Sequence, residues 1–286
     1  MIHYAYLRWL HTQEEHRIKD ERRVLTGWLI EHKELFAQRA PGRTCIESLR
    51  NVLEIGNPAS NNSKGCGGVM RIAPIGMFFQ ALGGSNPGAG SENFQRAFDL
   101  GCDAAALTHG HPTGYLAAGV MAALIFDLLG GADLLNAIDH VLPLLKARQS
   151  HEETLAALDK VRHLYLSDMA SDCAIRQLGG GWIAEEALAI GVYSALKATT
   201  FEEGVIMAVN HNGDSDSTGL IAGQLLGAAR GVSEIPPRWL APLELRDVIE
   251  EMADDLATVG TWRLDYTDEP DASAEEAYYT RRYPGA

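Results

Sequence analysis

Apolar residues recur at helical spacing along most of this chain. Tyr4, Leu7 and Leu10 follow one another at intervals of three residues, and comparable spacing with charged residues in between continues through most of the sequence. Such spacing is typical of amphipathic helices. The pattern predicts an N-terminal helix around Tyr4–Leu10, a less regular one around Val24–Leu35, and further helices over 91–107, 113–129, 132–147, 152–167, 182–197, 201–210, 215–230 and 242–258.

Breakers separate these helices, and no series of alternating β-branched residues predicts strands. Pro112 lies at an expected first turn, where a missing N–H costs nothing, and Gly130–Gly131 is expected to end the same helix. Loops are expected at 56–68, 83–91, 178–181 and 231–237. We therefore predict an all-α fold, with one domain over residues 1–264 and a surface tail over 265–286.

Composition narrows the class of protein. The 286 residues include 24 Lys and Arg against 38 Asp and Glu, which gives a net charge of −14. This balance argues against a general nucleic-acid binder, which needs a basic face.

The apolar stretch 114–126 is short for a bilayer span and predicts a buried helix. The four cysteines are widely spaced, and the first residues lack signal-peptide features. We expect a cytoplasmic protein without nucleic-acid or membrane partners.

Residues 210–231 (NHNGDSDSTGLIAGQLLGAARG) hold the strongest candidate chemistry. Asp214, Asp216 and Ser217 offer two carboxylates and a hydroxyl where a helix begins, and such hard oxygen donors suit Mg²⁺, Ca²⁺ or Mn²⁺. Taken alone, the motif is more often a plain helix cap, because Asp and Ser satisfy free N–H groups at a helix start. An EF-hand is a third interpretation, but its twelfth position holds Leu225 instead of Glu.

Glycines recur every four residues behind this motif, at 219, 223, 227 and 231. Each interior glycine costs a helix about 0.5–1 kcal/mol relative to alanine. The spacing predicts a smooth ridge against which another helix packs closely, on a buried helix that presents the carboxylates at its N-terminus.

Three further segments carry candidate residues. In 61–76 (NNSKGCGGVMRIAPIG), glycine-rich backbone before a helix suits an anion such as a diphosphate, although an ordinary loop fits the same letters. In LTHGHPT, His109 and His111 suit a metal, acid–base chemistry or a structural role. In GGGWIAEEALAIGVY, Trp182 offers a stacking surface or simple core packing.

In this order, the stretches SKGCGGVMRIAPIG, LTHGHPTGYLAAGVMAALI, GGGWIAEEALAIGVY and HNGDSDSTGLIAGQLLGA resemble the ADP-ribosylglycohydrolase family. IHYAYLRWLHTQ is similar to the helix that follows the N-terminal block of bacterial members. The resemblance implies an all-α domain with a binuclear Mg²⁺ centre, sometimes Mn²⁺, beneath an ADP-ribose cleft. It implies hydrolysis of the glycosidic bond between ADP-ribose and a protein side chain, often arginine, or a small ADP-ribosyl compound.

The resemblance also implies roles for individual residues. Asp214 and Asp216 would be catalytic, and together with Ser217, which stands where Thr is usual, they would be metal ligands. The substrate-binding residues would be Ser63, Lys64, Gly65, Cys66, Gly67, Gly68, His109, Trp182 and Ile183. Cys66 occupies a position where many relatives carry Asn.

One departure from the family separates two hypotheses. The family normally opens with a Ser/Thr-Asp-Asp block that supplies further metal ligands, and before Ser63 this chain has Asp20 as its single Asp. The helical pattern also starts at residue 2 without a cap, as it would in a chain lacking an upstream segment. We predict a hydrolase whose other ligands come from elsewhere, an omitted segment or a second subunit of a homo-oligomer. The alternatives are a degenerate ADP-ribose-binding regulatory protein and a ligand-free structural protein.

Overall fold

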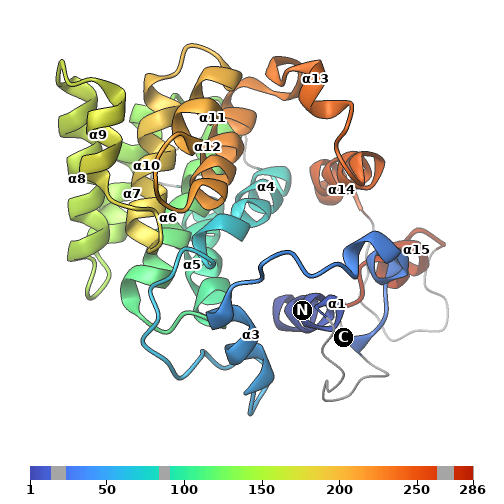
Figure 1. Cartoon of the computed structure of the whole chain (residues 1–286). Coiled ribbons are helices and arrows are strands. Elements are labelled where there is room, and N and C mark those ends of the chain that lie inside the picture. Colours follow the sequence, from blue (N-terminus) through green and yellow to red (C-terminus); the bar gives the residue numbers. More distant parts are fainter. Residues whose placement is uncertain (14–23, 84–90, 263–273, 286) are drawn as a thin grey trace.

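The computed structural model describes residues 1–13, 24–83, 91–262 and 274–285, and within these ranges the chain is helical without strands. Figure 1 shows a body of packed helices beside a smaller part that holds both chain ends. The longer helices are α1 (Ile2–Thr12), α3 (Arg43–Arg50), α4 (Ala73–Ala81), α5 (Glu92–Ala106), α6 (Pro112–Leu129), α7 (Leu134–Lys146), α8 (Glu152–Leu166), α9 (Ser171–Leu178), α10 (Ala184–Lys197), α11 (Phe201–Val209), α12 (Ser215–Arg230), α14 (Arg246–Thr258) and α15 (Ala274–Arg282).

Short helical turns link these elements. They are the 3₁₀ turns η1 (Trp28–Glu31), η2 (Lys33–Leu35), η3 (Val69–Arg71), η4 (Val232–Glu234) and η5 (Val259–Thr261), with the one-turn helix α13 (Pro237–Leu240).

The all-α prediction is confirmed, and the eight helices predicted between 91 and 258 all form. The helix expected around Val24–Leu35 is wrong, because Trp28–Leu35 folds as the two short turns η1 and η2. Gly27 precedes η1 at a φ of 97° and so breaks any continuous helix there. Asp20, most of the expected 83–91 loop and the first part of the tail lie outside the described residues.

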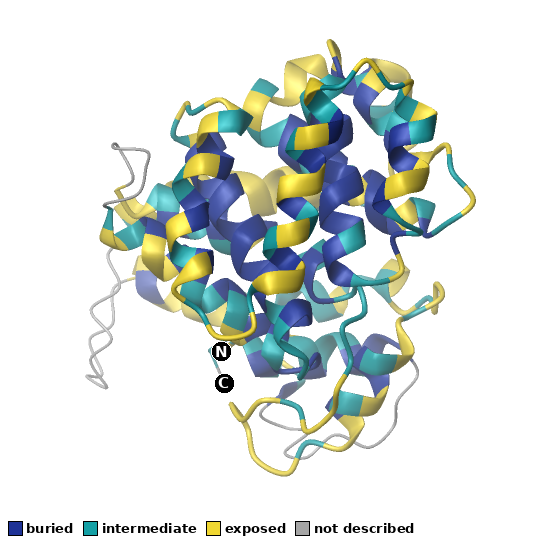
Figure 2. Ribbon diagram, turned by 90° about the vertical axis from the view of Figure 1, so that its left-hand side faces the viewer, coloured by how far each residue is buried: buried dark blue, intermediate teal, exposed yellow. Residues whose placement is uncertain are grey.

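Helix α6 forms the centre of the body. His111 caps it by accepting the Thr113 N–H at 3.1 Å, Pro112 occupies its first turn, and Gly130 ends it. By length and composition α6 resembles a membrane span, but 83% of it is buried inside the protein. In Figure 2 most of the buried residues lie on the ribbons at the centre of the body, as expected for core helices. The prediction of a buried helix is confirmed.

The smaller part has a hydrophobic cluster of its own. Leu7 and Leu10 of α1 pack with Val24 and with Ile46 and Leu49 of α3, apart from the main core. The described end of the tail packs here too. The Arg282 guanidinium lies 3.6 Å from the centre of the Trp28 ring.

The two chain ends meet in this part of the molecule. A methyl group added at Gly285 would lie 3.3 Å from the side chain of Met1. Figures 1 and 2 both place the two termini side by side.

The glycine ridge of α12 faces α11, but only one of its glycines is needed for close packing. A methyl group at Gly219 would lie 2.5 Å from Val209, whereas methyl groups at Gly223 and Gly227 would find their nearest neighbours at 3.8 and 4.0 Å. Gly231, at a φ of 79°, ends the helix. The close approach predicted for the ridge is therefore confined to Gly219.

Candidate active site

The glycine loop, residues 63–68, is held by backbone contacts to the segment that enters α10. The Ala184 N–H donates to the Lys64 carbonyl at 2.8 Å, and the Cys66 N–H donates to the Trp182 carbonyl at 3.2 Å. Gly65 and Ile183 form an isolated antiparallel bridge between these two bonds. Two segments that are far apart in sequence thus form one wall of a site.

A third segment, the turn before α12, joins this wall at Gly180. The Asp214 N–H donates to the Gly180 carbonyl at 2.8 Å. A methyl group at Gly213 would lie only 1.9 Å from the same carbonyl oxygen. Glu186 fixes the other side of the Gly180 segment, because its carboxylate accepts the N–H groups of Gly180 and Gly181 at 2.9 and 3.1 Å. The N-terminus of α12 is therefore brought against the glycine loop.

Asp214 faces Cys66 across this contact. The Cys66 thiol donates to Oδ2 of Asp214 at 2.8 Å, and its sulfur lies 3.4 Å from Oγ of Ser217. Asp214 and Ser217 are buried, with 8% and 3% of their surfaces exposed. Although Asp214 is the N-cap residue of α12, its side chain makes no capping hydrogen bond. A simple cap therefore does not account for this carboxylate.

Asp216 lies on the solvent side of the same turn and interacts with Asp214. Burial and the hydrogen bond with Asp216 raise the pKa of Asp214. The hydrogen bond with Asp214 holds the pKa of Asp216 below its usual range. Two adjoining carboxylates that favour one shared proton are also suited to sharing a cation.

The donor set fits one hard cation better than two. Asp214, Asp216 and Ser217 offer two carboxylates and a hydroxyl, and Mg²⁺ is commonly bound through one or two carboxylates and several waters. Across the described residues, no group of three or more His, Cys, Asp and Glu side chains is arranged to hold a metal ion. The binuclear centre therefore stays a prediction, with Asp214, Asp216 and Ser217 as its candidate donors among these residues.

Lys64 is engaged by two carboxylates other than Asp214 and Asp216. Its ammonium group donates to Glu153 at 2.7 Å and to Glu185 at 2.8 Å, which ties the glycine loop to α8 and α10. Both hydrogen bonds raise the pKa of Lys64, the one to Glu153 most. Ser63 is also engaged, with its hydroxyl oxygen 3.0 Å from that of Thr44. The expected diphosphate contact is thus left to the backbone of the loop.

Trp182 is the exposed member of the site. Its side chain is 63% accessible, although its carbonyl is fixed by Cys66. A methyl group at Gly180 would lie 3.0 Å from the indole ring, so the ring lies over that segment. Ile183 serves as the N-cap residue of α10. An exposed indole at a fixed backbone position suits stacking on a planar or sugar group.

His109 lies behind the glycine loop. Methyl groups at Gly65 and Gly67 would each lie 3.5 Å from Nε2 of His109, whereas the Cys66 side chain between them points to Asp214. The loop thus separates His109 from the carboxylates. Burial, assisted by the nearby Arg71 cation, lowers the pKa of His109 to about 3, so the imidazole is neutral.

His111, considered beside His109 in the sequence, has a separate position and a structural role. Its ring atom Nδ1 caps α6, and its backbone N–H donates to the Ser63 carbonyl at 3.2 Å. The two histidines therefore do not form a pair.

The sequence analysis did not assign Arg71, Thr108, Glu153 or Glu186 to the site. Arg71 was the detectable one, because it is a lone charge inside the apolar run VMRIAPIGMFF. The others carry no local signal, since their partners are distant in sequence.

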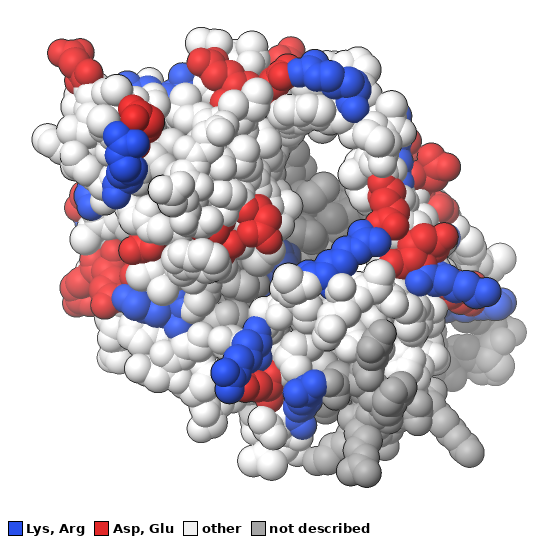
Figure 3. All heavy atoms as spheres, viewed as in Figure 1, with Lys and Arg blue, Asp and Glu red and all other residues white. Residues whose placement is uncertain are grey.

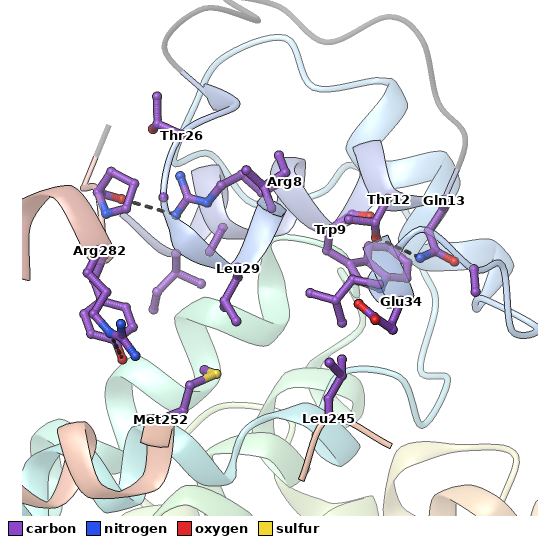
Figure 4. A pocket seen from close by; sticks show the side chains of 18 of the residues that line it. Arg8, Trp9, Thr12, Gln13, Thr26, Leu29, Glu34, Leu245, Met252 and Arg282 are labelled. Atoms are coloured by element: carbon purple, nitrogen blue, oxygen red, sulfur yellow. Dashed lines mark hydrogen bonds between the residues drawn. The ribbon is translucent and has the colours of Figure 1, made fainter. Parts of the chain in front are cut away.

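A cavity of about 650 Å³ lies elsewhere, between α1, the turns η1 and η2, α14 and the last residues of the chain. Leu29, Leu245 and Met252 converge on it from three segments (Figure 4). The face in Figure 3 carries interspersed acidic and basic side chains and is hollowed between the helical body and α14. None of the candidate site residues lines this cavity.

The fold and the carboxylate-bearing helix start agree with one class of protein. The chain belongs to the ADP-ribosylglycohydrolase family, whose model matches residues 2–265. It is 31% identical over 192 residues to an uncharacterized protein of Archaeoglobus fulgidus, covering 66% of this chain and 56% of that protein. It is 26% identical over 208 residues to the ADP-ribosyl-[dinitrogen reductase] glycohydrolase of Rhodospirillum rubrum, covering 72% of this chain and 60% of that protein.

A solved structure described as an ADP-ribosylglycohydrolase-related protein complex is also similar. It superimposes with a TM-score of 0.52 at 27% identity, over 90% of this chain and 78% of that one. The chain spans less than two thirds of the length of both relatives above, 56% and 60%.

Proposed function

We propose that this protein hydrolyses the glycosidic bond that joins ADP-ribose to a protein side chain, with arginine as the favoured acceptor. The observation that carries the proposal is the buried Asp214 beside Asp216, facing a glycine loop at the start of α12. Membership of the family supports a hydrolase. The net charge of −14 favours a cationic acceptor such as a guanidinium group.

We propose Mg²⁺ as the cofactor, with Mn²⁺ as the alternative. Asp214, Asp216 and Ser217 would hold it, and the remaining positions would fall to water, substrate or residues beyond those described. When bound, the cation supplies Lewis-acid polarisation of ribose oxygens and offsets the charge of the diphosphate.

The other residues of the site would bind and orient the substrate. The backbone N–H groups of the glycine loop would bind the diphosphate, and the exposed Trp182 would provide a flat apolar surface for a base or ribose. Asp216, whose pKa is lowered by its bond with Asp214, remains an anion able to orient a water toward the anomeric carbon.

Cys66 would act as a hydrogen-bond donor rather than a nucleophile. Burial, together with the adjoining Asp214, raises the pKa of Cys66 to about 12, so the thiol keeps its proton.

The hydrogen bond between Cys66 and Asp214 supports the second candidate function, an ADP-ribose-binding protein without turnover. The thiol occupies an oxygen of Asp214 that a cation would otherwise use. A ligand-free structural protein is the third candidate, and Asp214 argues against it, since this carboxylate is buried without making a capping hydrogen bond.

We propose a cytoplasmic location, since the four cysteines are free thiols and suit a reducing compartment.

The deciding experiment follows release of ADP-ribose from ADP-ribosyl-arginine protein with Mg²⁺ and with EDTA. Calorimetric titration of ADP-ribose is run in parallel, using wild type, Asp214→Asn and, as a matched control outside the site, Asp172→Asn. Mg²⁺-dependent release lost only in Asp214→Asn supports the hydrolase. Binding without release supports the regulatory protein. No binding and no release in wild type would contradict both.

A further inference from the structure

Arg71 is a half-buried cation at the junction of the two parts of the molecule. It ends η3, and its guanidinium carbon lies 4.3 Å from the centre of the Tyr6 ring of α1. One NH₂ group donates to Sγ of Cys45 in α3 at 3.1 Å, and the other donates to Oγ1 of Thr108 at 2.6 Å. No carboxylate within the described ranges pairs with it. Its hydrogen bonds therefore go to neutral groups that it orients.

Thr108 transmits this orientation to His109. Its hydroxyl oxygen accepts the hydrogen bond from Arg71, and its own hydrogen has two acceptors in reach: Nδ1 of His109 at 2.8 Å and the Ala105 carbonyl at 3.3 Å. The Ala105 carbonyl already accepts the N–H groups of Thr108 at 3.0 Å and of His109 at 2.9 Å. A carbonyl with two acceptor positions filled is a poor third partner at the longer distance. The hydroxyl hydrogen therefore goes to Nδ1.

A neutral imidazole that accepts at Nδ1 carries its proton on Nε2. Nε2 lies along the glycine loop, 3.5 Å from where methyl groups at Gly65 and Gly67 would stand. A methyl group at either position would contact the ring, and one at Gly67 would also lie 3.1 Å from Sγ of Cys45. The imidazole is thus the backing of the loop, on the side opposite to Asp214.

We propose that Arg71 and Thr108 are positioning residues that fix His109 as its Nε2–H tautomer, and that this imidazole holds the glycine loop so that Cys66 meets Asp214. Arg71 thereby ties α1 and α3 of the smaller part to the geometry of the site. The inference rests on the proposed function only in naming ADP-ribose as the ligand that reports on the loop.

The test compares Thr108→Val, which keeps the shape and removes the hydroxyl, with Thr108→Ser, which keeps the hydroxyl. Histidine-labelled protein gives the ¹⁵N resonances of both ring nitrogens, and His109→Gln assigns the His109 pair by its loss. Hydrogen exchange is followed at the Cys66 and Ala184 amides, which bond the loop to the 182–184 segment.

We expect wild type and Thr108→Ser to show an unprotonated Nδ1 and a protonated Nε2. Thr108→Val should show a mixture of tautomers, with exchange at both amides about tenfold faster, the equivalent of one lost hydrogen bond. ADP-ribose affinity should weaken in parallel and be restored by Thr108→Ser.

A proton on Nδ1 in wild type would overturn the proposal, as would unchanged amide exchange in a folded Thr108→Val protein. Absence of ADP-ribose binding in wild type, with the expected ¹⁵N and exchange results, would leave this role in place and contradict the proposed function instead.

Discussion

The thiol of Cys66 donates a hydrogen bond to Oδ2 of Asp214 over 2.8 Å, between residues 148 positions apart in the sequence. It joins the glycine loop to the first turn of α12 and occupies one oxygen of the candidate cation site.

Removing this donor should strengthen cation binding. In Cys66→Ala the Oδ2 atom of Asp214 loses its competing partner, and a hydrogen bond worth about 1 kcal/mol corresponds to roughly fivefold in affinity. We expect Mg²⁺ to bind about fivefold more tightly, measured by calorimetry. Cys173→Ala, which alters a thiol of α9 that contacts Arg176, is the matched control. Weaker Mg²⁺ binding in Cys66→Ala would show instead that the thiol organises the carboxylate.

Gly213→Ala should destabilise the protein and open the site. The added methyl would lie 1.9 Å from the Gly180 carbonyl, which is backbone and has no rotamer to change. We expect a loss of about 1–3 kcal/mol in the free energy of unfolding, measured in urea. The control is Gly223→Ala in α12, where the added methyl would lie 3.8 Å from its nearest neighbour, Val205. We expect this substitution to be neutral or to stabilise the protein by up to about 1 kcal/mol. Equal effects of the two substitutions on the free energy of unfolding would refute the close approach of Gly213 to the Gly180 carbonyl.

Acid should destabilise the protein through His109. An imidazole in the unfolded chain takes up its proton near the ordinary pKa of 6.5, whereas in the folded protein the pKa of His109 is lowered to about 3. Between these pH values the unfolded state binds more protons than the folded state. The contribution of His109 to the free energy of unfolding is therefore fully present above pH 6.5 and is lost as the pH drops toward 3. The slope from this one group is about 1.4 kcal/mol per pH unit.

Other groups titrate in the same range, so the measurement is the difference between wild type and His109→Gln in the free energy of unfolding at successive pH values. That difference should change with pH below 6.5 and be constant above it. A difference that is flat down to pH 4 would contradict the burial of a neutral His109.

Lys64→Met should loosen the glycine loop more than it destabilises the protein. It removes the cation between Glu153 and Glu185, and Glu185 is 8% exposed. Because Glu153 is half exposed and screened, we expect a loss of about 1 kcal/mol in the free energy of unfolding. The loop should become accessible to protease, whereas the control Lys33→Met, at an exposed site, should change neither property. Adding Glu185→Gln to Lys64→Met should recover part of the stability, since it removes the charge left behind.

The sequence was sufficient for what depends on local pattern. Helical spacing located α5 to α8, because periodic burial on one face is written in neighbouring residues. It failed at Trp28–Leu35, where Gly27 and packing against Arg282 override a helix-like spacing. At the site, the type of residue marked Asp214 and Asp216. Nothing local revealed that Lys64 is taken by Glu153 and Glu185, or that His109 lies behind the loop, because both depend on partners from other elements.

The three segments of the site lie around residues 65, 181 and 214, on loops that meet only after the intervening helices have packed. Closing such long stretches of chain is entropically costly, so contacts of this kind form late in folding. No fragment short of the whole helical body can bring Cys66 to Asp214. A ligand that binds here therefore recognises only the finished protein, and its binding is a sensitive assay for correctly folded molecules in any preparation of this chain or its variants.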